Sequence, residues 1–177
     1  MTPDFATRTS LKPPNGRKEA YAFAEFNPVQ HIGRDGRMIP AWEMANVSRI
    51  LLPQPLPYLD GAYVTRVAVH RKAAVTLIAA LSAIHDSGLW DFLAPYGGGF
   101  QFRRIGGSPL LSMHSLALAL DFDPANNARD LPADQSRFGA SAGGREVVRL
   151  FGLYGWAWGG DFQKRPDAMH FQFATGV

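Results

Sequence analysis

The sequence predicts a single α+β domain with a mainly antiparallel sheet and flanking helices. Residues 64–69 are rich in β-branched and apolar side chains, which is typical of a strand. Residues 72–86 carry apolar side chains at helical spacing. The order of such segments along the chain favours helices packed beside an antiparallel sheet, and 177 residues are enough for one domain with a core.

Residues 1–60 are set apart by frequent Pro and Gly, as in the segments 13–16, 33–36 and 52–57. We expect an irregular N-terminal arm packed on the domain, with one short helix at residues 41–50. The remainder, residues 61–177, is then the domain proper.

Within that domain the expected elements begin with a strand at residues 64–69 and a helix at 72–86, which Gly88 would cap. A second helix is predicted at residues 143–151, where Gly152 would end it.

Composition excludes some classes of protein. The chain has no cysteine, so no disulfide framework supports it. Its N-terminus lacks the basic and apolar regions of a signal peptide, and no apolar stretch approaches 18 residues. We therefore expect a protein made in the cytoplasm without a signal peptide and without stable membrane insertion. We also expect a monomer. A net charge of +3 is mildly basic, which favours anionic surfaces such as cell wall, membrane or nucleic acid. Among these we expect cell wall as the partner and no nucleic acid.

The residues with most chemical content are two histidines and two carboxylates. His114, Asp121 and His170 are of the types that bind zinc, and Asp167 stands three residues before the last of them. A carboxylate placed there could act as a general base without binding the metal. Together they are the residues that a hydrolytic zinc site with one open coordination position needs.

Geometry constrains how these ligands meet. Ligand atoms on tetrahedral zinc lie roughly 3 to 3.5 Å apart, whereas His114 and Asp121 would be about 23 Å apart in a straight strand and about 10 Å apart along a helix. The chain must therefore turn back at residues 115–117 and continue as a strand at 118–122. Residues 169–173 alternate polar and apolar side chains, which predicts a strand that buries its apolar face and presents His170 to a cleft.

Three separated motifs now resemble one family. Ser112-x-His114-x(6)-Asp121, the run Trp158-Gly159-Gly160-Asp161-Phe162, and Asp167-x-x-His170-Phe171 are similar to motifs of the zinc D-alanyl-D-alanine carboxypeptidases and L-alanyl-D-glutamate endopeptidases, which share their fold with the hedgehog signalling domain. Residues 100–108 resemble the arginine-bearing segment of the branch that contains phage endolysins. The resemblance covers residues 64–173 and implies that residues 61–177 are a catalytic domain.

The resemblance implies a role for each site residue. The zinc ligands would be His114, Asp121 and His170. Asp167 would be the general base for the attacking water, Arg103 would steady the substrate carbonyl and the developing oxyanion, and Ser112 would lie in the substrate cleft. Arg104, the next residue, could take the role of Arg103 instead. Trp158 is a candidate for the wall of the substrate cleft or for the hydrophobic core.

The sequence departs from the family pattern at two positions. Ala117 stands where the family usually has glycine, so we expect the turn to use a conformation that alanine tolerates. Gln172 stands where many relatives have Glu, a residue that is not a metal ligand in the family.

Three other histidines and one aspartate have structural interpretations. We expect His31, His70 and His85 to be surface or hydrogen-bonded histidines, since none has a ligand-like partner at useful spacing. Asp123 precedes Pro124, which favours a strand-end cap or turn over metal binding.

The resemblance implies an enzyme of the phage endolysin type, which acts on the cell wall after release and cuts the L-alanyl-D-glutamate bond of peptidoglycan stem peptides. A D-alanyl-D-alanine carboxypeptidase is the second interpretation. A third is a non-catalytic binding domain in which zinc only supports the fold. Asp167 discriminates against the third, because a structural site has no use for a free carboxylate beside an open coordination position.

Overall fold

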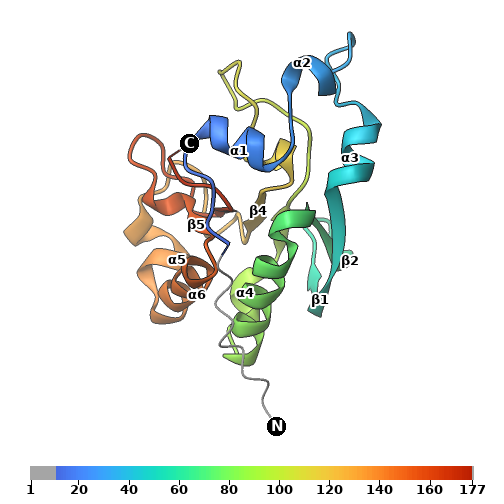
Figure 1. Cartoon of the computed structure of the whole chain (residues 1–177). Coiled ribbons are helices and arrows are strands. Elements are labelled where there is room, and N and C mark those ends of the chain that lie inside the picture. Colours follow the sequence, from blue (N-terminus) through green and yellow to red (C-terminus); the bar gives the residue numbers. More distant parts are fainter. Residues whose placement is uncertain (1–10, 177) are drawn as a thin grey trace.

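The computed structural model describes residues 11–176 and has the expected α+β class (Figure 1). A four-stranded antiparallel sheet has the strand order β3-β4-β6-β5, and a separate two-stranded hairpin is formed by β1 and β2. No helix within the described residues is long and apolar enough to cross a membrane.

The four-stranded sheet carries the candidate ligands. Its strands are β3 (Tyr96–Gly98), β4 (Ala119–Phe122), β6 (His170–Gln172) and β5 (Ala157–Trp158). In the pairing of β4 with β6, Asp121 lies directly opposite His170, and Leu120 lies opposite Phe171. Opposite residues on neighbouring antiparallel strands have Cβ atoms about 4.5–5.5 Å apart. The register alone therefore brings together two side chains that are far apart in the sequence.

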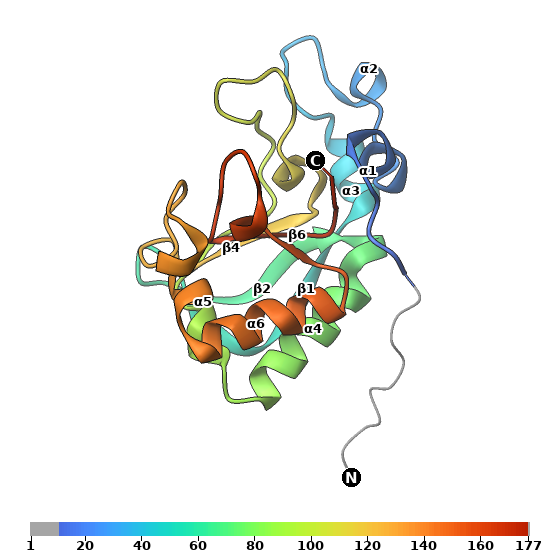
Figure 2. The same cartoon turned by 90° about the vertical axis from the view of Figure 1, so that its left-hand side faces the viewer.

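Helices cover one side of β4 and β6. Figure 2 shows α4 (Ala74–Asp86) and α6 (Ala142–Leu153) running below these strands, with the short α5 (Arg137–Ala140) at one end. Phe171 of β6 points into this layer, where its ring centroid is 4.3 Å from that of Phe151 and 5.2 Å from that of Phe138. All three rings are fully buried. The alternation along β6 thus puts Phe171 in the core and leaves His170 and Gln172 on the opposite face.

The predicted elements of the domain are confirmed with small shifts at their ends. The strand expected at residues 64–69 is β2 (Tyr63–His70), and the two expected helices are α4 and α6. The prediction that Gly152 ends the second helix is wrong, because α6 continues to Leu153. Gly88 follows the last turn of α4 with φ +69°, a conformation that favours glycine at a helix end.

The N-terminal part is more regular than expected. It contains α1 (Arg17–Phe23), α2 (Pro28–His31), α3 (Pro40–Asn46) and β1 (Val47–Pro57). Prolines begin α2 and α3, where a missing N–H costs nothing, so proline here starts helices instead of preventing them. The expected helix at residues 41–50 ends early because its last four residues belong to β1.

The proline-rich half of β1 still pairs with β2. Their register shifts between Leu51 and Leu56, around Pro53 and Pro55, which matches the tolerance of edge strands and bulges for proline. Ile50, Leu52 and Leu56 are buried, so the strand has a genuine inner face. The division of the chain at residue 60 stays a prediction, and the β1–β2 pairing joins its two sides.

Short 3-10 helices complete the path of the chain. They are η1 (Arg71–Ala73), η2 (Trp90–Leu93), η3 (Met113–Leu116), η4 (Ala133–Gln135) and η5 (Gly159–Asp161). Two of them, η3 and η5, adjoin the strands of the candidate site.

Candidate metal centre

The fold-back predicted after His114 is made by η3. The Ser112 hydroxyl accepts a hydrogen bond from the His114 N–H, and the chain reverses at Ala117 before entering β4. Ala117 has φ 54° and ψ 32°, the left-handed conformation. We expected a conformation that alanine tolerates, but the turn uses the left-handed conformation that favours glycine, so this expectation is wrong.

One local and one tertiary hydrogen bond hold Ala117 in this conformation, which costs a non-glycine residue about 1–2 kcal/mol. Its N–H donates to the carbonyl of His114 at 3.1 Å, and its own carbonyl accepts from the N–H of His70 at 2.7 Å. The methyl group is buried. The turn is thus fixed from both sides, although its sequence lacks the glycine that favours it.

His114, Asp121 and His170 converge on one point. Nδ1 of His170 lies 3.0 Å from Oδ1 of Asp121 and 3.2 Å from Nε2 of His114, and the latter lies 3.3 Å from the same carboxylate oxygen. Three ligand atoms on tetrahedral zinc have this spacing, about 3 to 3.5 Å. The three side chains could therefore hold a metal ion without rearrangement.

The outer ring nitrogens of both histidines have acceptors. Nδ1 of His114 lies 2.8 Å from the carbonyl of Gly99, and Nε2 of His170 lies 3.1 Å from Oε1 of Gln172. A neutral imidazole that donates through one nitrogen presents a lone pair on the other. These contacts orient the lone pairs of Nε2 of His114 and Nδ1 of His170 toward the shared point, as metal ligation requires.

The charge of Asp121 suits a cation. Burial by itself would raise its pKa, but hydrogen bonds with His114 and His170 hold the pKa of Asp121 well below its usual value. Burial acts in the opposite sense on His170, and there the hydrogen bond with Asp121 prevails and raises the pKa of the imidazole. The cluster therefore contains an ionised carboxylate close to two imidazoles.

Asp167 lies beside the cluster of His114, Asp121 and His170 but is not one of its members. Its Oδ1 atom is buried and has no hydrogen-bond partner among residues 11–176, and its Oδ2 atom is 3.9 Å from Nε of Arg129. Burial raises the pKa of this carboxyl above its usual value. A buried carboxylate oxygen without a partner is costly, so it points to a molecule that the site takes up.

The Trp158-Gly159-Gly160 run positions Asp167. The N–H of Asp167 donates to the carbonyl of Gly159 at 2.9 Å, and the N–H of His170 donates to the carbonyl of Asp167 at 3.0 Å. A Cβ atom on Gly159 would lie 2.4 Å from that carbonyl oxygen of Asp167. Glycine is therefore required at position 159 for this close approach. The close approach fixes Asp167, the candidate general base, three residues before His170, a candidate metal ligand.

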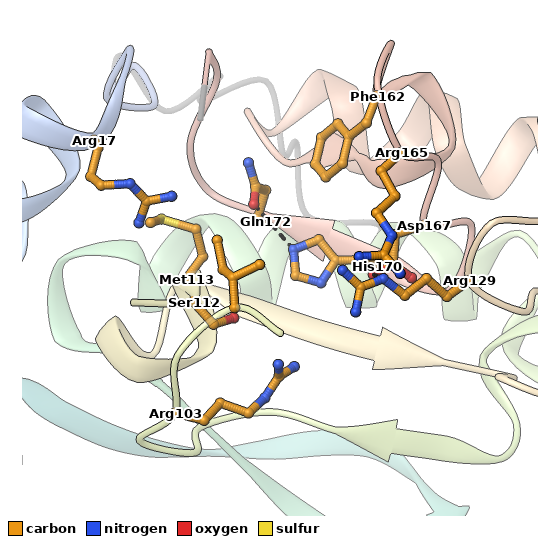
Figure 3. A pocket seen from close by; sticks show the side chains of 11 residues that line it. Arg17, Arg103, Ser112, Met113, Arg129, Phe162, Arg165, Asp167, His170 and Gln172 are labelled. Atoms are coloured by element: carbon orange, nitrogen blue, oxygen red, sulfur yellow. Dashed lines mark hydrogen bonds and ion pairs between the residues drawn. The ribbon is translucent and has the colours of Figure 1, made fainter. Parts of the chain in front are cut away.

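Two cavities flank the cluster. The first is lined by Asp167 and His170, together with Ser112 and Phe162 (Figure 3). The second is lined by His114 and Asp121, together with Tyr58 and the glycines 97–99. Arg103 lines both cavities. The cluster thus lies between two cavities, and the same cation, Arg103, lines both of them.

The structure distinguishes between the remaining candidates. Arg103 is exposed at the cavities, whereas the side chain of Arg104 donates to the carbonyl of Pro109 in the adjacent turn. Trp158, expected as a cleft wall or core, lies in the core, where its indole N–H donates to the carbonyl of Ala168 at 2.7 Å. Phe162, two residues after Gly160, supplies the aromatic wall of the first cavity in its place.

The other polar residues have structural environments. His70 is fully buried, where burial lowers its pKa to about 4, and it lies 3.4 Å from the carbonyl of Ala24. Asp123 is buried, accepts from Arg137 at 2.9 Å, and lies outside the cluster. Both agree with the structural interpretation of these residues.

Three arginines at the first cavity were not identified from the sequence. They are Arg17, Arg129 and Arg165. No motif in the sequence marked them, because only the fold brings α1 and the loops that carry Arg129 and Arg165 to one cavity.

Gln172 is expected to tune metal binding through His170. Its side-chain N–H donates to the carbonyl of Ala174 at 3.0 Å, which fixes Oε1 as the acceptor for His170. Gln172→Leu should weaken zinc binding about 10- to 100-fold, since loss of a partner that orients a ligand has this effect. The dissociation constant can be measured by competition with a chromophoric chelator.

Gln172→Glu is the matched control for this prediction, because it keeps an acceptor oxygen at the same position. Equal zinc affinity of the Leu and wild-type proteins would show that Gln172 does not orient His170.

Comparison with known proteins gives one match. Residues 106–173 match a family model described as D-alanyl-D-alanine carboxypeptidase. Searches with the chain found no similar curated protein and no similar solved structure. The matched segment contains the three converging side chains and Asp167. This match shows that residues 106–173 are similar to peptidases of the D-alanyl-D-alanine carboxypeptidase family.

Proposed function

We propose that this chain is a zinc-dependent endopeptidase that hydrolyses the L-alanyl-D-glutamate bond of peptidoglycan stem peptides, as a phage-type endolysin does. The observation that carries the proposal is the buried, unpartnered Oδ1 of Asp167 in the cavity beside the His114, Asp121 and His170 cluster. A purely structural metal site would not need this carboxylate, so the same observation argues against a non-catalytic binding domain.

Each residue of the site has a defined task in this proposal. His114, Asp121 and His170 hold zinc, which when bound activates water and polarises a carbonyl. Asp167 takes a proton from the attacking water and passes it to the leaving amine. Arg103 places a permanent positive charge where negative charge develops, a form of stabilisation worth about 3 to 4 kcal/mol per donor. Ser112 contributes a polar group to the cavity wall beside His170.

The choice of bond rests on the space around the cluster. An endopeptidase must accommodate substrate on both sides of the scissile bond, and cavities lie on both sides of these ligands, with Arg103 at each. This arrangement favours an endopeptidase.

A D-alanyl-D-alanine carboxypeptidase is the second candidate. The description of the matching family model favours it, and so do the arginines at the first cavity, because a carboxypeptidase must recognise a terminal carboxylate.

The product termini decide between these activities. Purified zinc-loaded protein should be incubated with peptidoglycan and with a soluble pentapeptide stem, and the products identified by mass spectrometry. We expect a new amino group on D-Glu and little free D-Ala. Free D-Ala as the main product would support the carboxypeptidase instead, and no new terminus of either kind would contradict a peptidase that acts on stem peptides.

A further inference from the structure

The arginines of the first cavity differ in their ion pairs. Arg165 forms an ion pair with Asp130 at 2.9 Å, and Arg129 lies 3.9 Å from Asp167. Within residues 11–176, neither Arg17 nor Arg103 forms an ion pair with a carboxylate. Since the proposed reaction already employs Arg103, Arg17 is the cation at this cavity whose charge has no assigned partner.

Arg17 comes from outside the segment that matches the family model, yet its position is fixed. The N–H of Gly16 donates to the carbonyl of Thr175 at 2.7 Å, and the N–H of Thr175 donates to the carbonyl of Pro14 at 2.9 Å. Figures 1 and 2 both show α1 beside the C-terminal segment that follows β6. Because this segment continues directly from β6, which begins at His170, the backbone sets where Arg17 lies relative to the metal cluster.

The side chain of Arg17 extends toward the cavity. Figure 3 shows it at one end, across Met113 and Ser112 from Asp167 and Arg129 at the other. Its Nη1 atom donates to the carbonyl of Leu111, which holds the guanidinium while leaving its other donors available. The cavity has a volume of about 220 Å³, below the roughly 300–1,000 Å³ of sites for drug-sized ligands, and Arg17 and Asp167 both line it.

The position of Asp167 indicates which half of the substrate enters this cavity. A general base that returns its proton to the leaving amine must lie beside that amine. Asp167 lines the first cavity, so the residue that carries the leaving amine belongs there. In a stem peptide whose D-Glu is linked through its side chain, that residue has a free α-carboxylate next to the amine.

We propose that Arg17 is a specificity-determining residue that binds a carboxylate on the amine-side half of the substrate. This inference rests on the proposed peptidase function and identifies a carboxylate as the substrate group that Arg17 binds. The guanidinium suits the task because it presents paired donors to a carboxylate and keeps its charge at every physiological pH. The carboxylate has two possible sources, the α-carboxylate of D-Glu and the C-terminus of the peptide.

Three peptides test the proposal with the zinc-loaded full chain: a free stem peptide, the same peptide with D-isoglutamine in place of D-Glu, and the same peptide with an amidated C-terminus. Wild-type protein should show a KM about 10- to 100-fold higher for one of the two amides, which identifies the source of the carboxylate. Arg17→Gln should raise the KM for the free peptide by a similar factor and abolish that preference, with kcat changed much less. Arg17→Lys should restore part of the preference.

Lys18→Gln is the matched control, since Lys18 is an exposed cation on the same helix. Circular dichroism verifies that all variants fold. The proposal is overturned if wild-type protein cleaves the three peptides equally well, or if Arg17→Gln behaves like Lys18→Gln. Failure of wild-type protein to release any new amino terminus would instead overturn the proposed peptidase function, so the two failures are distinguishable.

Discussion

Replacement of His114, Asp121 or His170 by Ala is expected to remove zinc and abolish peptide hydrolysis. The three ligand atoms lie within 3.3 Å of one another, so each variant would leave only two protein ligands where the proposed site has three. In the proposed reaction, bound zinc would activate the attacking water and polarise the carbonyl, steps that Asp167 and Arg103 only assist. We therefore expect activity to fall to background in all three variants and zinc content to fall with it, as measured by atomic absorption.

Two surface variants serve as controls for the chemistry of the lost side chains. His85→Ala removes a histidine whose side chain is 40% exposed, and Asp86→Ala removes a carboxylate that is 69% exposed. Both should keep full zinc content and activity. Circular dichroism should accompany each measurement, because ligands in the core also support the fold. Full zinc occupancy in the three ligand variants would contradict the assignment.

The sequence predicted the path of the chain from His114 to Asp121 better than the N-terminal part, for a physical reason. Zinc requires ligand atoms about 3 to 3.5 Å apart, and that requirement left a turn followed by a strand as the only local path from His114 to Asp121. The η3 turn and β4 follow this path. The conformation of Ala117 was not predictable, because its cost is met by contacts with His70 and the rest of the fold, which the local sequence does not contain.

The N-terminal part shows the opposite case. Proline and glycine there suggested irregular chain, but proline also begins helices and is accepted at bulged strands, so composition alone could not separate these outcomes. Arg17 and Trp158 illustrate the same limit. Only the tertiary path places the Arg17 guanidinium at the cavity, and only the position of the Ala168 carbonyl directs the Trp158 indole into the core.

Asp167→Asn is expected to keep zinc and lose most of its turnover. Asn has nearly the same shape as Asp and leaves the backbone hydrogen bonds to Gly159 and His170 intact, but it cannot accept the proton of the attacking water. General acid–base catalysis contributes about 100- to 10,000-fold, so kcat should fall by that factor while zinc content stays at the wild-type level. Asp161→Asn, an exposed carboxylate in the adjoining η5 segment, should change neither quantity.

The pH dependence of the rate tests the same role in a second way. A general base acts only when deprotonated, so the rate should fall as the pH drops through the pKa of Asp167. Burial raises that pKa, and the acidic limb of the wild-type profile should therefore lie above the usual value for Asp, about 3.9. The residual activity of Asp167→Asn should lack this limb, because the titrating group is gone. A wild-type profile that keeps its acidic limb unchanged in Asp167→Asn, or near-native kcat in that variant, would assign the base to another residue.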